Sequence, residues 1–226
     1  MSSLQVVEAS PSAPVRATDR PTLIFDFDGT LADTFPAIIE MVNDHADEFH
    51  IRPLDEQDVE DLRGLSNLEI IRKYNIPLFK VPGLILRSQK ELHRRMGAVD
   101  LFPGIRELIL ELKDEGFGLG ILTSNSRENV QKLLRDRGLD VFDFIHSESN
   151  LFGKNRALLH LMRVHGLKRD EVVYVGDEMR DIEACRRIPV SVIAVSWGFH
   201  RRDMLLGREP DYLVDTPDEI RSIVMG

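Results

Sequence analysis

The amino-acid sequence predicts an α/β protein: a doubly wound, Rossmann-like parallel sheet core with an inserted small α-helical cap subdomain. Short apolar runs rich in Val, Ile, Leu and Phe recur along the chain, and most do not alternate with polar residues, which is typical of parallel strands covered on both faces. Amphipathic helical patterns separate these runs, and this alternation predicts right-handed crossovers. Residues 35–98 have helical patterns without a convincing strand, which indicates the insert.

Six apolar runs are the candidate strands, and helical patterns lie between them. The runs are TLIFDF (22–27), GLGILT (118–123), VFDFI (141–145), VVYVG (172–176), SVIAVS (191–196) and YLV (212–214). In 104–116, apolar residues follow the i, i+3, i+4, i+7 spacing of a helix that ends at Gly116. A helix is expected over 125–138, with Asn125 and Glu128 as a capping pair and Gly138 at its end. Further helices are expected at 154–165, at 179–187 and from Thr216 onward, with Pro217 in the first turn.

These patterns divide the chain into three parts. Residues 21–34 and 99–226 are expected to form the core domain, residues 35–98 the cap, and residues 1–20 a disordered tail, since they are rich in Ser, Ala and Pro. Within the cap, the segments 35–50, 66–74 and 83–96 are amphipathic, and Pro53, Pro77 and Pro82 mark breaks between them.

Composition narrows the classes of partner. A net charge of −9 over 226 residues argues against a general nucleic-acid binder or a protein that binds anionic membranes. No apolar run in the sequence approaches the ~18 residues of a membrane span. The single cysteine, Cys185, rules out an intramolecular disulfide framework, fits a cytoplasmic location and is expected to be buried. We expect a monomer or a homodimer.

The stretch 22-TLIFDFDGTLADT-34 places two acids where the first strand ends. Side chains at i and i+2 of a strand point the same way, so Asp26 and Asp28 converge if the extended geometry persists. The carboxyl ends of parallel strands are where open sheets bind ligands. Because two convergent carboxylates repel each other unless a cation lies between them, the pair favours Mg²⁺, which prefers hard oxygen ligands.

Three further strand ends carry polar groups. The second strand ends in 121-ILTSNS-126, which supplies hydroxyls and backbone N–H groups where a helix begins. Lys154 follows the third strand, and the fourth ends in Gly176-Asp177 with Asp181 four residues on. Taken singly, these are an N-cap, a surface lysine and a capping acid, and Asp28-Gly29 is a turn. Taken together, acids, a hydroxyl and a lysine at four successive strand ends predict one site.

This ordered set resembles the haloacid dehalogenase-like hydrolase superfamily. Its four motifs are matched by Asp26-Phe27-Asp28-Gly29-Thr30, by Thr123, by Lys154, and by Asp177 with Asp181. The stretches LFPGI, GDEMRDIEA and VSWGF are similar to those of phosphoglycolate-phosphatase-type members, and the insert lies where members with a small helical cap carry it. The resemblance covers the chain from about residue 20 to its end.

The resemblance implies a phosphatase that hydrolyses a small phosphorylated metabolite through an aspartyl phosphate. Asp26 would be the nucleophile, and Asp28 the general acid and then the base. Mg²⁺ would be held by Asp26, the Asp28 backbone carbonyl and Asp177, with Asp181 orienting Asp177 or a metal-bound water. Thr123, Ser124 and Lys154 would hold the phosphoryl oxygens. The substrate-binding set implied in full is Gly29, Thr30, Ser124, Asn125 and the cap residue Arg63.

Other residues and functions are weighed against this reading. Arg63 is either an exposed arginine at a helix end or a group that reaches the substrate, and Glu178 and Arg180 are expected to be solvated helix residues. The seven histidines show no metal-binding spacing and receive no role. A phosphosugar mutase is an alternative, although the mutases often carry Val where Thr30 stands. A phosphonate hydrolase would need a cap lysine, dehalogenation needs neither metal nor second acid, and a non-catalytic binding module is the alternative from a different class.

Overall fold

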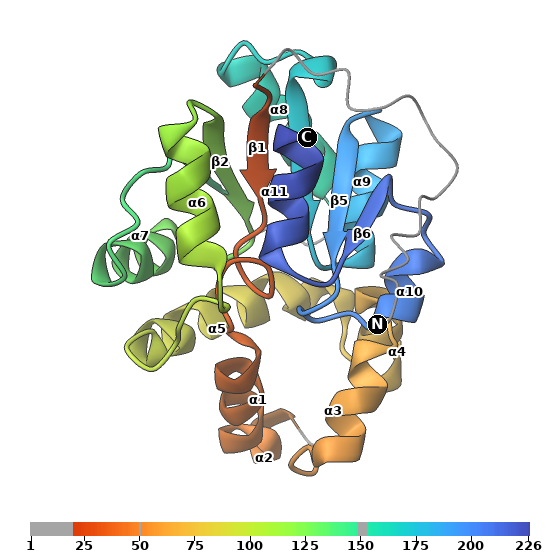
Figure 1. The fold of residues 1–226 in the computed structure, drawn as a ribbon. Coiled ribbons are helices and arrows are strands. Elements are labelled where there is room, and N and C mark those ends of the chain that lie inside the picture. The colour runs from red at the N-terminus through yellow and green to blue at the C-terminus, as the bar shows by residue number, and fades with distance from the viewer. Residues whose placement is uncertain (1–19, 50, 149–152) are drawn as a thin grey trace, which may run out of the picture.

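The computed structural model describes residues 20–49, 51–148 and 153–226, and its centre is one parallel sheet (Figure 1). The six strands run in the order β3-β2-β1-β4-β5-β6. They are β1 (Thr22–Phe25), β2 (Gly118–Thr123), β3 (Phe144–Ser147), β4 (Val172–Gly176), β5 (Ser191–Val195) and β6 (Tyr212–Val214). All neighbouring strands pair in parallel, which confirms the predicted doubly wound α/β class.

Helices cover both faces of the sheet because successive strand residues face opposite sides. Leu23 and Phe25 pack into one apolar cluster with α6, α7 and α11, whereas Ile24 packs into another with α8, α9 and α10. The bounds are α6 (Ile105–Asp114), α7 (Arg127–Asp136), α8 (Lys154–Val164), α9 (Met179–Arg187), α10 (Arg202–Leu206) and α11 (Pro217–Met225). A short 3₁₀ turn, η2 (Arg169–Glu171), precedes β4. Cys185 is fully buried in the second cluster, as predicted.

The remaining helices lie together beyond the carboxyl ends of the strands, at the bottom of Figure 1. They are α1 (Phe35–Asp44), α2 (Ala46–Phe49), α3 (Glu56–Arg63), α4 (Asn67–Lys73), the 3₁₀ turn η1 (Leu78–Lys80) and α5 (Val81–Arg95). We call this group the helical insert and propose that it is the predicted cap; the boundaries at residues 35 and 98 stay predictions. The expected tail, residues 1–20, lies outside the described residues except for Arg20.

Three details of the predicted elements are wrong. Strand β3 begins at Phe144 instead of at residue 141. Asp143 takes up both backbone groups of Leu119, because the Asp143 N–H donates to the Leu119 carbonyl and the Asp143 carboxylate accepts from the Leu119 N–H, both at 2.8 Å. Helix α7 is capped by Ser126, whose hydroxyl accepts from the Asn129 N–H at 3.2 Å, and not by Asn125. Pro82 does not break a helix but lies in the first turn of α5, where a missing N–H costs nothing.

Within the described ranges, none of the helices combines the length and the apolar content that a membrane crossing requires.

Candidate active site

The predicted site lies where three neighbouring strands end. Asp26 follows β1 and Asp177 follows β4, while Thr123 is the last residue of β2. Because β1 pairs in parallel with both β2 and β4, these residues meet at one edge of the sheet. Lys154 begins α8 and Asp181 lies in the first turn of α9, so the first turns of two helices add their side chains to the same place.

Three carboxylates form the deepest part of the site. Asp26, Asp177 and Asp181 each offer an oxygen atom, and these atoms lie within 4.8 Å of one another. Their side chains are almost fully buried, at 2%, 0% and 0% exposure. Burial, together with Glu178 and the two other carboxylates, raises the pKa of Asp177 well above its ordinary value. Burial also raises the pKa of Asp181 to about 6, although Lys154 opposes the rise.

Lys154 neutralises only part of this charge. Its Nζ lies 2.5 Å from Asp26 Oδ2 and also pairs with Asp181, and the ammonium sits 5.3 Å from the centre of the Tyr174 ring. Burial alone would lower the pKa of Lys154, but Asp181 and Asp26 outweigh it and raise that pKa. The three buried carboxylates carry more negative charge than the one ammonium neutralises, so a divalent cation would be stabilised there. A set of ligands made only of oxygen atoms suits Mg²⁺.

Two glycines allow the backbone to approach Asp177 closely. Gly29 has a φ of +78°, and a Cβ placed there would lie 2.2 Å from Asp177 Oδ2. A Cβ at Gly198 would lie 2.3 Å from Asp177 Cβ. The carboxylate in this cradle is oriented by the Thr30 hydroxyl and by the Phe199 N–H, which each donate to it at 2.7 Å. A fixed, crowded carboxylate at a strand end is what a metal ligand requires.

Asp28 has a different set of partners. The chain turns after β1, since the Leu31 and Ala32 N–H groups both donate to the Phe27 carbonyl, so extended geometry does not persist to Asp28. Its Oδ1 accepts from Asn125 Nδ2 at 2.9 Å, and Thr123 Oγ1 lies 3.5 Å from its Oδ2. Burial and the Asp26 carboxylate raise the pKa of Asp28 to about 6. Asp28 can therefore gain or lose a proton near neutral pH, as a general acid and base must.

The substrate-binding set inferred from the sequence is only partly available. The Gly29 N–H already donates to the Ala32 carbonyl at 2.9 Å, and the Thr30 side chain is fully buried against Asp177. The Asn125 amide is engaged by Asp28. Gly29 and Thr30 therefore support Asp177, and Asn125 supports Asp28. The substrate contacts of Gly29, Thr30, Ser124 and Asn125 stay predictions.

Arg63 contacts the loop that follows β5. Its Nε donates to the Phe199 carbonyl and its Nη2 to the Gly198 carbonyl, both at 3.0 Å. The side chain is partly buried, at 30% exposure, and connects α3 to this loop, so the exposed arginine expected from the sequence is wrong. Its contact with a substrate stays a prediction. The Phe199 N–H of that loop donates to Asp177, so Arg63 supports the site indirectly, through the loop.

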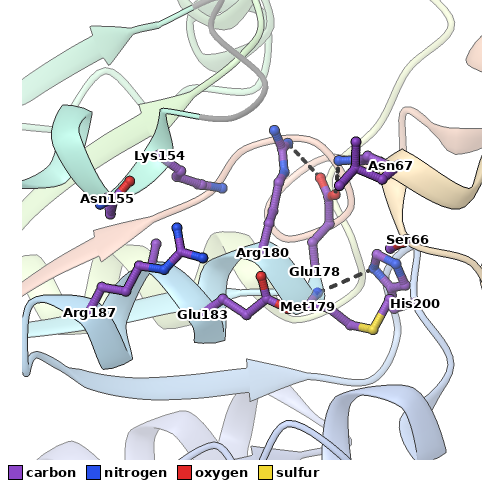
Figure 2. Close-up of a pocket in the computed structure, with 12 residues that line it drawn as sticks. Ser66, Asn67, Lys154, Asn155, Glu178, Met179, Arg180, Glu183, Arg187 and His200 are labelled. Carbon is purple, nitrogen blue, oxygen red and sulfur yellow. Dashed lines mark hydrogen bonds and ion pairs between the residues drawn. The ribbon is translucent and has the colours of Figure 1, made fainter. Parts of the chain in front are cut away.

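A cavity of about 210 Å³ opens beside Lys154, between the insert and the core. Figure 2 shows Ser66 and Asn67 on one side of it and Lys154 and Asn155 on the other, with Glu178 and Arg180 between them. Glu178 lies at its edge: Arg180 donates to it at 2.6 Å and Asn67 at 3.4 Å. The leaving group of a small substrate could occupy this space.

Glu178 and Arg180 were expected to be solvated, and this is wrong. Their side chains are 13% and 18% exposed and form an ion pair. Burial alone would raise the pKa of Glu178, but Arg180 and Lys154 outweigh it and lower that pKa to about 2. The spacing of charges in GDEMRD carried no sign of burial, because a helix-surface pair has the same pattern.

Comparisons with known proteins agree with this geometry. Residues 23–195 match the haloacid dehalogenase-like hydrolase family. A phosphoglycolate phosphatase of Synechococcus elongatus is 38% identical over 203 residues, which cover 89% of this chain and 96% of that protein. The pyrophosphatase PpaX of Bacillus mycoides is 26% identical over 208 residues, which cover 90% of this chain and 96% of that protein.

Solved structures show the same fold. A predicted phosphatase from Clostridium acetobutylicum superposes with a TM-score of 0.78 at 23% identity, covering 91% of this chain and 99% of the other. A predicted phosphoglycolate phosphatase from Haemophilus somnus gives a TM-score of 0.72 at 21% identity, covering 91% and 98%. The family match spans most of the chain and includes all four motifs, which confirms the predicted hydrolase class. The chain belongs to the haloacid dehalogenase-like hydrolase family.

Proposed function

We propose that this protein is a Mg²⁺-dependent phosphatase that hydrolyses a small organic phosphomonoester through an aspartyl phosphate on Asp26. The observation that carries the proposal is the separation of the two acids. Asp26 lies among carboxylates and against Lys154, whereas Asp28, with a pKa raised to about 6, lies against a neutral amide. A nucleophilic carboxylate and an acid that exchanges protons are the two roles that the reaction needs.

In the first step, an Asp26 carboxylate oxygen attacks phosphorus and the bond to the leaving oxygen breaks. Asp28, protonated, donates its proton to that oxygen, so an alcohol leaves. Lys154, the Thr123 hydroxyl and the Ser124 N–H would hold the phosphoryl oxygens. In the second step, Asp28 accepts a proton from water, and the water oxygen attacks phosphorus and releases phosphate and free Asp26.

The acid cluster fits a resident Mg²⁺. Asp26, Asp177 and the Asp28 backbone carbonyl would hold it, and Asp181, whose Oδ2 accepts from the Glu178 N–H at 3.0 Å, would orient the neighbouring groups. When bound, the cation screens the repulsion between the carboxylate nucleophile and the anionic phosphoryl group.

Phosphoglycolate is the favoured substrate. The relative from Synechococcus elongatus is named for it, and a cavity of about 210 Å³ suits a small leaving group. We also propose that the protein is cytoplasmic and acts on a small metabolite as a monomer or homodimer. The phosphosugar mutase and the non-catalytic binding module stay alternatives.

The test is phosphate release from a panel of phosphoglycolate, sugar phosphates, nucleotides and pyrophosphate, with Mg²⁺ and with EDTA. We expect Mg²⁺-dependent release that is fastest for a small phosphomonoester. A requirement for a sugar bisphosphate, without net phosphate release, would replace the proposal with a mutase. Release from no compound by folded protein would favour the binding module.

A further inference from the structure

A chain of amide hydrogen bonds runs from the helical insert to Asp28. Asn129, on α7, donates from its Nδ2 to the Gln89 backbone carbonyl on α5 and to Asn125 Oδ1, both at 2.9 Å. Asn125 Nδ2 in turn donates to Asp28 Oδ1 at 2.9 Å. The insert and the side chain proposed as the general acid are thus joined by two amides.

Backbone groups fix the direction of every bond in this chain. The Gln89 carbonyl can only accept, so the Asn129 atom facing it must be the amide nitrogen. The Ser126 N–H, which can only donate, contacts Asn125 at 2.8 Å, so that atom must be Oδ1 and the other atom must be the nitrogen that faces Asp28. Asn129 Oδ1 is left to accept from His93 Nδ1, 2.6 Å away.

Burial makes the two amides dependent on each other. The Asn129 and Asn125 side chains are 0% and 3% exposed, so water cannot replace a lost partner at low cost. His93 and the Gln89 side chain lie nearer the surface, where Gln89 Nε2 makes a second contact between the insert and the core, at 2.5 Å from the Ser124 carbonyl. The orientation of Asn129 therefore depends on the contact between α5 and α7, whereas Asn125 is also held by the Ser126 N–H.

We propose that Asn129 is a positioning residue that aligns Asp28 for proton transfer, and that it does so only when the insert is docked on the core. The hydrogen-bond chain holds Asp28 Oδ1 at 2.9 Å, whereas Oδ2 accepts a longer hydrogen bond, 3.5 Å, from Thr123 Oγ1. Oδ2 is therefore the oxygen proposed to carry the transferred proton. The kinetic part of this inference rests on the proposed function.

The first test is structural and needs no activity. Crystal structures of the wild type and of Asn129→Leu would be compared at the Asn125 and Asp28 side chains. We expect the 2.9 Å bond from Asn125 to Asp28 in the wild type and its loss in the variant, because Asn125 Oδ1 then loses one of its two donors and is held by the Ser126 N–H alone. Retention of that bond in Asn129→Leu would overturn the proposal. This result can be read even if the proposed phosphatase activity fails.

The second test separates positioning from general damage. Rapid-mixing experiments would measure the first step, release of the leaving group, for phosphoglycolate and for p-nitrophenyl phosphate. An alkoxide needs a proton from Asp28, whereas p-nitrophenolate does not. We expect Asn129→Leu to slow the phosphoglycolate step by about 30-fold at a similar KM, part of the ~10²–10⁴-fold that general acid catalysis supplies, and the p-nitrophenyl phosphate step by less than about 3-fold.

Two further variants complete the experiment. His93→Phe, at an exposed position, is expected to fold and to show the same selectivity with a loss of about 3-fold, because it removes the outermost donor. Arg201→Gln is the control. It removes an ion pair between core and insert, in which Arg201 Nη1 lies 3.8 Å from Glu60 Oε1, and Arg201 takes no part in the chain of amide hydrogen bonds. The rates with both substrates should stay unchanged. Equal losses on the two substrates in Asn129→Leu would overturn the proposal. If Asn129→Leu does not fold, His93→Phe decides, and a loss that is not selective for phosphoglycolate would overturn the proposal.

Discussion

The insert contacts the candidate site on two sides, and the two contacts differ in chemistry. On the α3 side, the charged guanidinium of Arg63 donates hydrogen bonds to the carbonyls of Gly198 and Phe199, and the Phe199 N–H donates to Asp177. On the α5 side, neutral amides lead from Gln89 through Asn129 to Asp28. Both sides end on a buried acid, and each acid has a different task in the proposed reaction.

The two contacts reach the two acids through different elements. Asp177, proposed to bind a cation, receives the Thr30 hydroxyl and the Phe199 N–H, and burial among other carboxylates raises its pKa well above the ordinary value. Asp28, proposed to exchange a proton, receives the Asn125 amide and the more distant Thr123 hydroxyl, and its pKa is raised to about 6. Variants that break one side at a time should therefore affect different measurements.

Among the variants that break one of the two sides, the largest effect is expected from Asp177→Asn. Loss of a proposed ligand should reduce Mg²⁺-dependent phosphate release by about 10³-fold, and the Mg²⁺ titration of activity should shift to higher concentration. Without metal the same variant should be more stable than the wild type, because the folded state no longer has to bury the Asp177 carboxylate among other acids. Urea unfolding in EDTA measures this difference.

The stability difference between Asp177→Asn and the wild type should depend on pH. The pKa of Asp177 is raised in the folded state above its ordinary 3.8, so ionisation costs stability as pH rises above that value. The stability advantage of Asp177→Asn should be absent below the ordinary pKa of 3.8 and grow as pH rises above it. An advantage that does not change with pH would contradict the role of the carboxylate charge.

A smaller effect is expected from Arg63→Gln. The variant loosens the loop that donates to Asp177, and loss of such an outer partner should raise the Mg²⁺ concentration for half-maximal activity by about 10-fold. The preference between alkyl and p-nitrophenyl esters should not change, in contrast to Asn129→Leu. Arg72→Gln, an exposed charge change on the neighbouring α4, is the control. A changed preference between esters in Arg63→Gln would remove the distinction between the two sides.

The smallest effect is expected from Glu178→Gln. Removing this carboxylate leaves Arg180 without its charge partner, and the variant should lose about 1 kcal/mol of stability at neutral pH, a reduced value because the pair is partly exposed. The pKa of Glu178 is lowered from 4.5 to about 2, so the contribution is complete above 4.5 and disappears as pH falls through about 2. Urea unfolding of both proteins from neutral to acidic pH measures it. A difference that persists near pH 2 would contradict the ion-pair explanation.

The sequence predicted those features that depend on residues near one another in the chain. Strand β1, the turn at Gly29 and the acids that flank them all lie within one short stretch, and parallel topology then brings Thr123, Lys154 and Asp177 to the same edge. The order of the motifs and the hydrophobic patterns were therefore sufficient for the fold class and for the acid cluster.

The contacts between the insert and the core could not be predicted in this way. The bonds from Arg63 to Phe199 and from Asn129 to Gln89 join residues that are 136 and 40 positions apart, and no periodic pattern relates them. Asn129 looks in the sequence like an ordinary polar position of α7, and its burial follows only from how α5 lies against that helix. Local signals do not contain the docking of two elements.

The role of Asp26 as nucleophile is tested most directly by phosphate release from phosphoglycolate by the wild type and by Asp26→Asn, each with Mg²⁺ and with EDTA. We expect release by the wild type with Mg²⁺ only, and a loss of at least about 10⁴-fold in the variant, since the attacking oxygen is gone while the shape of the side chain is kept. Folded Asp26→Asn that released phosphate at the wild-type rate would contradict this role, because the nucleophile would then lie elsewhere.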